Sequence, residues 1–270
     1  MSEKIDLKLV KELRDQTQAP ISKCKEALES CSGDISKAKN WLRERAMVYA
    51  AKKSDRATEN GSSVLVFNEN KNKAAIIVLR CETDFVAKNE QFTQLAVHIA
   101  NEIVNKFSDC QLNSEQFGNV IINMNDNNTD NNMSVLDVIK QHIGIMGENI
   151  IPVSASVMSK NNDEIFESYV HNSYVPRISG KRAAVVKIKS NDNTNPIIQK
   201  LARDMVVHIV VAAPKFLSFD QIKDKEEHED SVLLEQKYAM DGSTKISSMI
   251  EEAGYDAKIT GFIFASVDNN

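Results

Sequence analysis

The stretch that decides the fold is the apolar run Ala74-Ala-Ile-Ile-Val-Leu79, followed by the segment Glu82-Thr-Asp-Phe-Val-Ala-Lys-Asn89. A run this apolar, ended by Thr-Asp, predicts a buried strand that leads into a short loop. Phe85 stands in that loop, where polar turn residues are usual. A large apolar side chain at the end of a strand belongs either to the protein's own core or to a surface that meets another protein. The residues alone leave both interpretations open.

The composition limits the kind of protein. The chain has 270 residues, of which 42% are hydrophobic and 26% charged, with a formal net charge of −5. These values are typical of a soluble globular protein of one or two domains. The acidic balance argues against a broad nucleic-acid-binding surface, which needs clustered Lys and Arg. The first residues contain no apolar signal core, and the longest apolar stretch, 206–214, is too short to span a bilayer. We therefore expect a cytoplasmic protein without membrane contacts.

The sequence lacks the usual motifs of catalysis. It contains no nucleotide-binding loop and no pair of histidines at metal-ligand spacing. Cys81 lies on the predicted buried strand without a visible activating base, which argues against a nucleophile. The cysteines follow no metal or redox pattern and predict buried thiols in a reducing compartment; they are Cys24, Cys31, Cys81 and Cys110. We therefore predict no catalytic residue, no cofactor and no metal site.

The first 55 residues predict three short helices. Apolar residues recur at helical spacing from Ile5 to Leu13, and a second such stripe follows Pro20, a residue favoured in the first turn of a helix. Gly33 ends this second helix, and Asp34 is placed to cap a third. The segment from Ala50 to Ser63 is polar and predicts a linker. Small helical modules of this kind are more often adaptors than catalysts.

A weak internal repeat organises the rest of the chain. The run beginning at Lys73 is similar to the run Arg182-Ala-Ala-Val-Val-Lys-Ile188. Each is preceded by another candidate strand and followed by an amphipathic helix, so each half predicts the order strand, strand, helix. Two such halves predict an α+β core. The Asn- and Asp-rich segment 111–134 predicts a loop between them, and residues 246–253 and 259–267 predict a final helix and strand.

Several short motifs, in this order along the chain, resemble the elongation factor Ts family of nucleotide exchange factors. They are Leu13-Arg14 with Cys24-Lys-Glu-Ala-Leu28, Thr83-Asp-Phe-Val86, Gly147-Glu-Asn-Ile150, Ser168-Tyr-Val-His171 and Thr260-Gly-Phe-Ile263. The motif at 83–86 matches fully and is the most specific. The module departs from the family at Ile21 and Ser22, where a methionine pair is common. A helical hairpin that many members insert near 220–230 is shortened here, and a C-terminal helix that follows the last strand in many members is missing.

The resemblance implies both an architecture and a function. A ubiquitin-associated-like module, residues 1–55, would precede two related subdomains, 56–155 and 156–270. The family binds the GTPase elongation factor Tu and promotes GDP release without covalent chemistry of its own. Thr83, Asp84, Phe85 and Val86 would form the exchange loop that disturbs the partner's magnesium site. Arg14, Ile21, Ser22 and His171 would contact the partner elsewhere. The alternative function is a non-catalytic adaptor that uses only the helical module. The resemblance does not fix whether the protein is a monomer or a homodimer.

Overall fold

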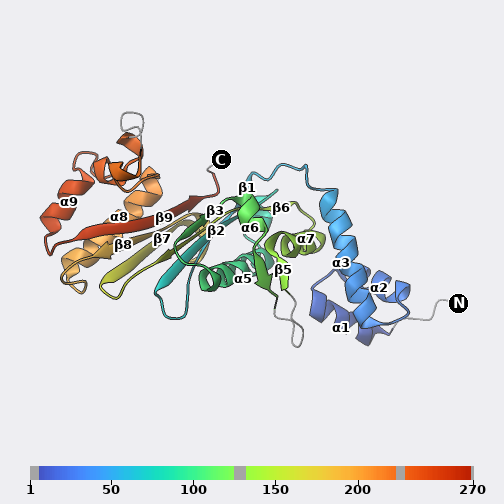
Figure 1. Ribbon diagram of the computed structural model, residues 1–270. Coiled ribbons are helices and arrows are strands. Elements are labelled where there is room, and N and C mark those ends of the chain that lie inside the picture. Colours follow the sequence, from blue (N-terminus) through green and yellow to red (C-terminus); the bar gives the residue numbers. More distant parts are fainter. Residues whose placement is uncertain (1–5, 125–131, 223–228, 269–270) are drawn as a thin grey trace.

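A computed structural model describes residues 6–124, 132–222 and 229–268 of the chain. It has the predicted α+β class, with helices at both ends of the molecule and antiparallel strands between them (Figure 1). The longer helices are α1 (Leu7–Thr17), α2 (Ile21–Ser30), α3 (Ile35–Ala51), α5 (Glu90–Lys106), α7 (Val135–Met146), α8 (Pro196–Ala212) and α9 (Ile246–Ala253). The shorter ones are α4 (Asp84–Ala87) and α6 (Ser114–Gly118), with the 3-10 turns η1 (Phe219–Gln221), η2 (Glu229–Ser231) and η3 (Leu233–Glu235).

The main sheet has the strand order β3-β6-β2-β1-β8-β7, and β9 also pairs with β8. Its strands are β1 (Asn60–Phe67), β2 (Lys73–Cys81), β3 (Cys110–Leu112), β6 (Ile150–Ser159), β7 (Glu164–Val175), β8 (Ser179–Lys189) and β9 (Lys258–Ser266); a separate pair is formed by β4 (Ile121–Asn123) and β5 (Asn132–Ser134). The order strand, strand, helix is present twice, as β1, β2 and α5 and as β7, β8 and α8. The boundary predicted at residue 155 falls inside β6, and the division into subdomains stays a prediction.

The two apolar runs that form the repeat are buried on both faces. On β2, Ile77 and Leu79 belong to a core shared with α5 and α7, while Ile76 faces a second cluster. That second cluster also contains Val185 of β8, whose neighbours Val186 and Ile188 face α8 and α9. Strands covered on both sides lose the usual apolar-polar alternation. This double burial explains why each run reads as continuously apolar.

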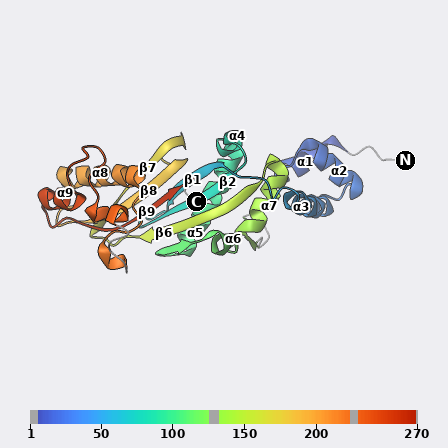
Figure 2. The same ribbon diagram turned by 90° about the horizontal axis from the view of Figure 1, so that it is seen from above.

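The N-terminal helices pack around a small core of their own, as predicted. Leu13, Cys24 and Leu28 are fully buried there. Asp34 caps α3 by accepting a hydrogen bond from the Lys37 backbone N–H at 2.9 Å. The helix α3 then runs beyond this core to α7, and Ala50 joins the core between β2 and α5. Figures 1 and 2 show α1 and α2 at one end of an elongated molecule, with α3 leading to the sheet.

Two predictions about connecting segments and one about the cysteines need correction. The linker is shorter than expected, because β1 already begins at Asn60. The segment 111–134 is not a plain loop: its described parts contain β3, α6, β4 and β5, with Asn113 forming a capping box at the start of α6. Residues 125–131 lie outside the described residues. Cys31 and Cys110 are only partly buried, although all four thiols are free.

The segment that follows the charged stretch at 220–230 is held by a histidine of α8. The charged stretch predicted at 220–230 falls partly on residues 223–228, which lie outside the described residues. Its downstream flank is fastened by His208, whose side chain is fully buried. The imidazole Nε2 lies 2.9 Å from Gln236 Oε1, and the Ala239 N–H donates to Nδ1 at 3.1 Å. Burial lowers the pKa of His208, so the ring is neutral and donates through Nε2.

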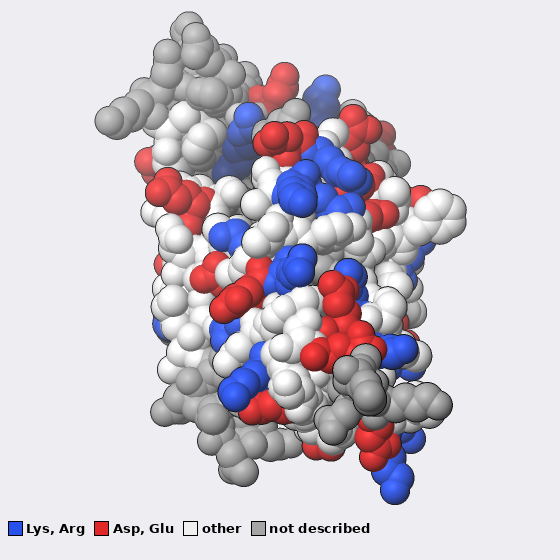
Figure 3. All heavy atoms as spheres, turned by 90° about the vertical axis from the view of Figure 1, so that its right-hand side faces the viewer, with Lys and Arg blue, Asp and Glu red and all other residues white. Residues whose placement is uncertain are grey.

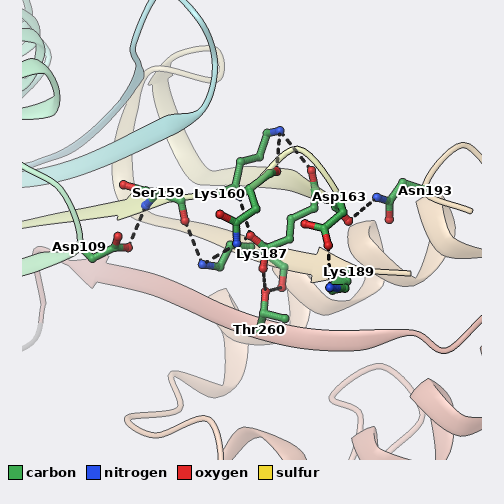
Figure 4. A network of polar contacts seen from close by, with 10 residues as sticks. Asp109, Ser159, Lys160, Asp163, Lys187, Lys189, Asn193 and Thr260 are labelled. Carbon is green, nitrogen blue, oxygen red and sulfur yellow. Dashed lines mark hydrogen bonds and ion pairs between the residues drawn. The ribbon is translucent and has the colours of Figure 1, made fainter. Parts of the chain in front are cut away.

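A polar network closes the turn between β6 and β7 (Figure 4). Glu164, whose side chain is 4% exposed, lies 3.8 Å from the Lys187 ammonium. The Thr260 hydroxyl and the Asn161 N–H donate to its two carboxylate oxygens at 2.6 and 2.7 Å. Lys187 also donates to the Ser159 carbonyl at 2.9 Å. The network therefore joins β6, β7, β8 and β9 at one end of the sheet.

Glu164→Ala is expected to lower the free energy of unfolding by about 3 kcal/mol, because it leaves the ammonium of Lys187 without its buried partner. We place the loss at the lower end of the range for buried pairs since Lys187 keeps the Ser159 carbonyl. Urea denaturation measures this change. The matched control is Asp163→Asn, which removes the exposed pair with Lys189 in the same turn and should hardly move the midpoint. Equal midpoints for both variants would contradict the prediction.

Candidate protein-interaction site

The segment predicted as the exchange loop forms one helical turn at the end of β2. Thr83 is the N-cap of α4, and its hydroxyl oxygen accepts a hydrogen bond from the Val86 N–H at 3.3 Å. The expected loop is therefore a short helix, because the Thr-Asp pair that ends a strand also starts a helix well. Ala87 is fully buried at the end of this turn, and Val86 packs against the core between β2 and α5.

Phe85 points away from this core. Its side chain is 83% exposed, which is the highest exposure among the large apolar residues of the described chain. The interpretation in which Phe85 fills its own core is therefore wrong. The ring therefore contributes little to the packing of the protein itself and is accessible at the surface.

Asp84 is tied to a neighbouring cation in the free protein. Its carboxylate lies 2.7 Å from the ammonium of Lys88, one helical turn later. The hydrogen bond from Lys88 lowers the pKa of Asp84, which keeps the carboxylate charged at neutral pH. The Lys88 ammonium also lies 5.9 Å from the centre of the Tyr174 ring on β7. Lys88 and Tyr174 were not predicted; the spacing of four residues between Asp84 and Lys88 is a signal that the sequence carries.

Carboxylates from two sides hold the base of the turn. Glu148, in the turn that follows α7, accepts hydrogen bonds from the Thr83 N–H and hydroxyl at 2.9 and 2.7 Å. Glu82 accepts one from the Asn149 N–H at 2.7 Å and lies 3.4 Å from the Arg56 guanidinium. The hydrogen bond from Asn149, and next the charge of Arg56, lower the pKa of Glu82. The motif Gly147-Glu-Asn-Ile150 thus meets the motif at 83–86 in space.

The other predicted contact residues lie apart from this turn in the sequence and on other elements. Arg14 lies on α1, and Ile21 and Ser22 begin α2; all three are exposed. Residues 6–56 contain more Lys and Arg than Asp and Glu, although the whole chain is acidic. Figure 3 shows the end of the molecule that these helices form, with lysines and arginines adjacent near the middle and acidic residues around them.

His171 lies on β7, paired in register with Arg182 of β8. It is partly buried, and its Nδ1 lies 3.5 Å from the Tyr169 hydroxyl. Tyr169, at 38% exposure, shares the same side of the strand. The pair therefore gives β7 an aromatic and imidazole surface.

Cys81, the thiol weighed as a nucleophile, lies fully buried on β2. Burial raises the pKa of Cys81 to about 12, so its thiol is a poor nucleophile. Within residues 6–124, 132–222 and 229–268, no three His, Cys, Asp or Glu side chains lie together as metal ligands would. Over the same ranges, every helix is too short or too polar to cross a bilayer.

The comparisons with known proteins identify the family. The sequence model described as "Elongation factor TS" matches residues 82–229. The chain is 32% identical to "Elongation factor Ts" of Ehrlichia canis (strain Jake), over 92% of both chains. It is 33% identical to "Elongation factor Ts" of Ehrlichia chaffeensis (strain ATCC CRL-10679 / Arkansas), over 96% of this chain and 97% of the relative. "Elongation factor Ts, mitochondrial" of Arabidopsis thaliana is 29% identical over 97% of this chain and 77% of its own length. The chain therefore belongs to the elongation factor Ts family and has the role of a translation elongation factor.

Proposed function

We propose that this protein is a guanine nucleotide exchange factor that binds elongation factor Tu with GDP and promotes GDP release. The observation that carries the proposal is the exposed ring of Phe85, presented on a turn whose two ends are anchored. In this proposal Phe85 enters a groove of the GTPase beside its magnesium site. Thr83 and Val86 hold the turn in place during this step. The protein performs no covalent chemistry.

The size of the side chain makes the proposal energetically reasonable. Burying one Phe removes roughly 150–250 Å² from water, and at roughly 25 cal/mol per Å² this contributes about 4–6 kcal/mol gross. At about 1.4 kcal/mol per factor of ten, full coupling to nucleotide release would speed dissociation by about 10³ to 10⁴. Association and ordering consume part of this free energy, so the real acceleration is smaller.

Asp84 supplies a negative charge next to Phe85. Its carboxylate would disturb the partner's magnesium ion and the water ligands of that ion. In the free protein the carboxylate is paired with Lys88, but exposed pairs of this kind are weak. Lys88 therefore does not prevent Asp84 from turning toward the partner.

The remaining contacts would hold the GTPase so that its groove faces Phe85. Arg14, Ile21 and Ser22 would dock the helical module on the partner, and His171 would add a contact from β7. For exchange to occur, the protein must prefer the nucleotide-free GTPase over the GDP form. Linkage then requires that nucleotide weakens the complex, so the partner is released once GTP binds.

We place this activity in the cytoplasm, with no direct nucleic-acid or membrane partner. Four free cysteines fit a reducing compartment. The acidic net charge fits a protein partner better than a nucleic acid.

Catalytic amounts of the purified protein should accelerate the release of fluorescent GDP from elongation factor Tu. Each molecule should act on many GTPase molecules, because the complex dissolves when new nucleotide binds. The measurement is the initial rate of fluorescence loss with the GTPase in at least tenfold excess. Release at the spontaneous rate would overturn the proposal.

A capture experiment separates exchange from the alternative function of a simple adaptor. An exchange factor should retain more nucleotide-free than GDP-loaded GTPase on a column of immobilised protein. Equal retention of both forms would favour an adaptor that uses only the helical module.

A further inference from the structure

The turn Gly147-Glu148-Asn149 lies between two segments of the chain. One is the exchange turn, which is Thr83 with α4, and the other is the segment that follows α3. Gly147 ends α7 in the left-handed region, with φ +79. The Lys53 ammonium donates to its carbonyl. The Asn149 side-chain amide donates to the carbonyls of Ser54 and Arg56 at 3.3 and 2.9 Å. The two ends of the turn, Gly147 and Asn149, are therefore held by the segment that follows α3, independently of its bonds to residues 82–83.

The two segments hold each other by reciprocal hydrogen bonds. Glu148 accepts from the Thr83 N–H, and Glu82 accepts from the Asn149 N–H. Glu148 makes one bond more, because its second oxygen accepts from the Thr83 hydroxyl at 2.7 Å. Hydrogen bonds to a charged carboxylate are among the stronger ones in proteins.

The extra bond reaches the helix that carries Phe85. The Thr83 hydroxyl donates its proton to Glu148 and so turns a lone pair toward the Val86 N–H, from which it accepts. The bond to Glu148 thereby fixes the orientation of the Thr83 hydroxyl, which is the N-cap group of α4. A helix of four residues has no stability of its own, and the exposed Phe85 ring gains little from packing. The direction of Phe85 therefore depends on how the two ends of the turn are held.

We propose that Glu148 is a positioning residue for nucleotide exchange: through Thr83 it sets the direction in which Phe85 meets the GTPase. The inference rests on the proposed exchange function. Glu148 does not contact the partner in this account. It reduces the number of conformations that the turn must give up when Phe85 enters the groove of the docked GTPase, which is how preorganisation favours the productive complex.

A merely structural role for Glu148 predicts different behaviour. In that case Glu148→Ala would lower the melting temperature, and activity would fall only with the folded fraction. Its effect would also add to that of Phe85→Ala, because the two residues would act independently.

The test compares Glu148→Ala, Glu148→Gln, Phe85→Ala and the double variant Glu148→Ala/Phe85→Ala in stimulated GDP release. We expect Glu148→Ala to lower kcat about tenfold with KM changed less than about threefold, a loss of ~1.4 kcal/mol in transition-state stabilisation. Glu148→Gln should recover most of the rate, since its amide oxygen still accepts from the Thr83 N–H and its NH₂ can donate to the hydroxyl. The double variant should be no slower than Phe85→Ala. Glu90→Ala, an exposed carboxylate at the start of α5, controls for the lost charge.

Melting curves and amide hydrogen exchange complete the test. Glu148→Ala should speed exchange of the amides at 83–88 while the sheet keeps its protection. A folded Glu148→Ala with wild-type kcat would overturn the inference, and so would additive losses in the double variant or no recovery with Glu148→Gln. If Glu148→Ala does not fold, a folded Thr83→Val with wild-type kcat overturns it instead. Wild-type activity of Phe85→Ala would refute the proposed role of Phe85 itself. A failure of the proposed function can therefore be told apart from a failure of the inference about Glu148.

Discussion

Phe85→Ala is expected to slow stimulated GDP release at least tenfold while leaving the melting temperature nearly unchanged. The ring is 83% exposed, and truncation of a surface side chain usually changes stability by less than about 0.5 kcal/mol. The activity should fall because the methyl group of alanine cannot fill the groove of the partner that the proposal assigns to Phe85. Melting and fluorescent GDP release should be measured on the same preparation.

Phe92→Ala is the matched control for this prediction. Phe92 lies seven residues later on α5 and is fully buried. Its truncation should destabilise the protein by about 3–5 kcal/mol and lower activity only through unfolding. A Phe85→Ala protein that melts far below the wild type, or that is stable and fully active, would defeat the proposed role of Phe85.

The sequence predicted the elements whose burial is visible in a local pattern. The two apolar runs on β2 and β8 were found because both of their faces are covered, which leaves a continuous run of Ala, Ile and Val. The helix at residues 246–253 was placed with its true bounds, since Gly254 marks its end. Local patterns of this kind depend only on neighbouring residues.

The strand β6 was missed because it contains a proline. Pro152 interrupts an otherwise apolar and small-residue stretch, and proline inside a run argues against a strand. The sheet accommodates it with an irregularity: Val78 of β2 pairs with Ser154 and Leu79 with Pro152, so one residue of β6 is extra. A bulge of this kind depends on the partner strand and has no signature in β6 alone.

Only part of the candidate site was predicted, because exposure and contacts between distant residues depend on the tertiary structure. Phe85 was singled out by its position after a strand, but both alternatives stayed open because exposure is a property of the tertiary structure. Glu148 and Asn149 belonged to a recognised motif without a role, since they meet Thr83 and Glu82 across more than sixty residues of chain. The contact roles of Arg14, Ile21, Ser22 and His171 stay predictions.

The second large effect is expected where α3 leaves the helical module and crosses α7. Gly144 of α7 faces Ala46 of α3 so closely that an added Cβ would lie 2.9 Å from the Ala46 Cβ and 3.2 Å from its Cα. Contacts below 3.0 Å force one helix to move. The helices α1 and α2 lie beyond this crossing (Figure 1). A small tilt of α3 therefore moves the predicted docking residues Arg14 and Ile21 further than it moves α3 at the crossing.

Gly144→Leu is therefore expected to raise the KM for the GTPase more than tenfold with little change in kcat. The exchange turn stays intact, but the module and Phe85 no longer engage one partner together, and the benefit of linked contacts is lost when the geometry forbids simultaneous binding. Steady-state exchange at varied GTPase concentration measures both constants. An unchanged KM would mean that the orientation of the module does not matter for exchange.

A size-swap pair decides whether the crowding at this crossing is the cause. Glycine in a helix interior is about 1 kcal/mol less favourable than alanine, so helix propensity alone predicts that Gly144→Ala stabilises α7. Overpacking predicts the opposite sign, at about 1–3 kcal/mol. We expect Gly144→Ala to melt lower and to raise KM several-fold, and Ala46→Gly/Gly144→Ala to recover much of both, because the second change removes the atom at 2.9 Å. If the double variant is no better than Gly144→Ala alone, the contact between α3 and α7 does not set the position of the module.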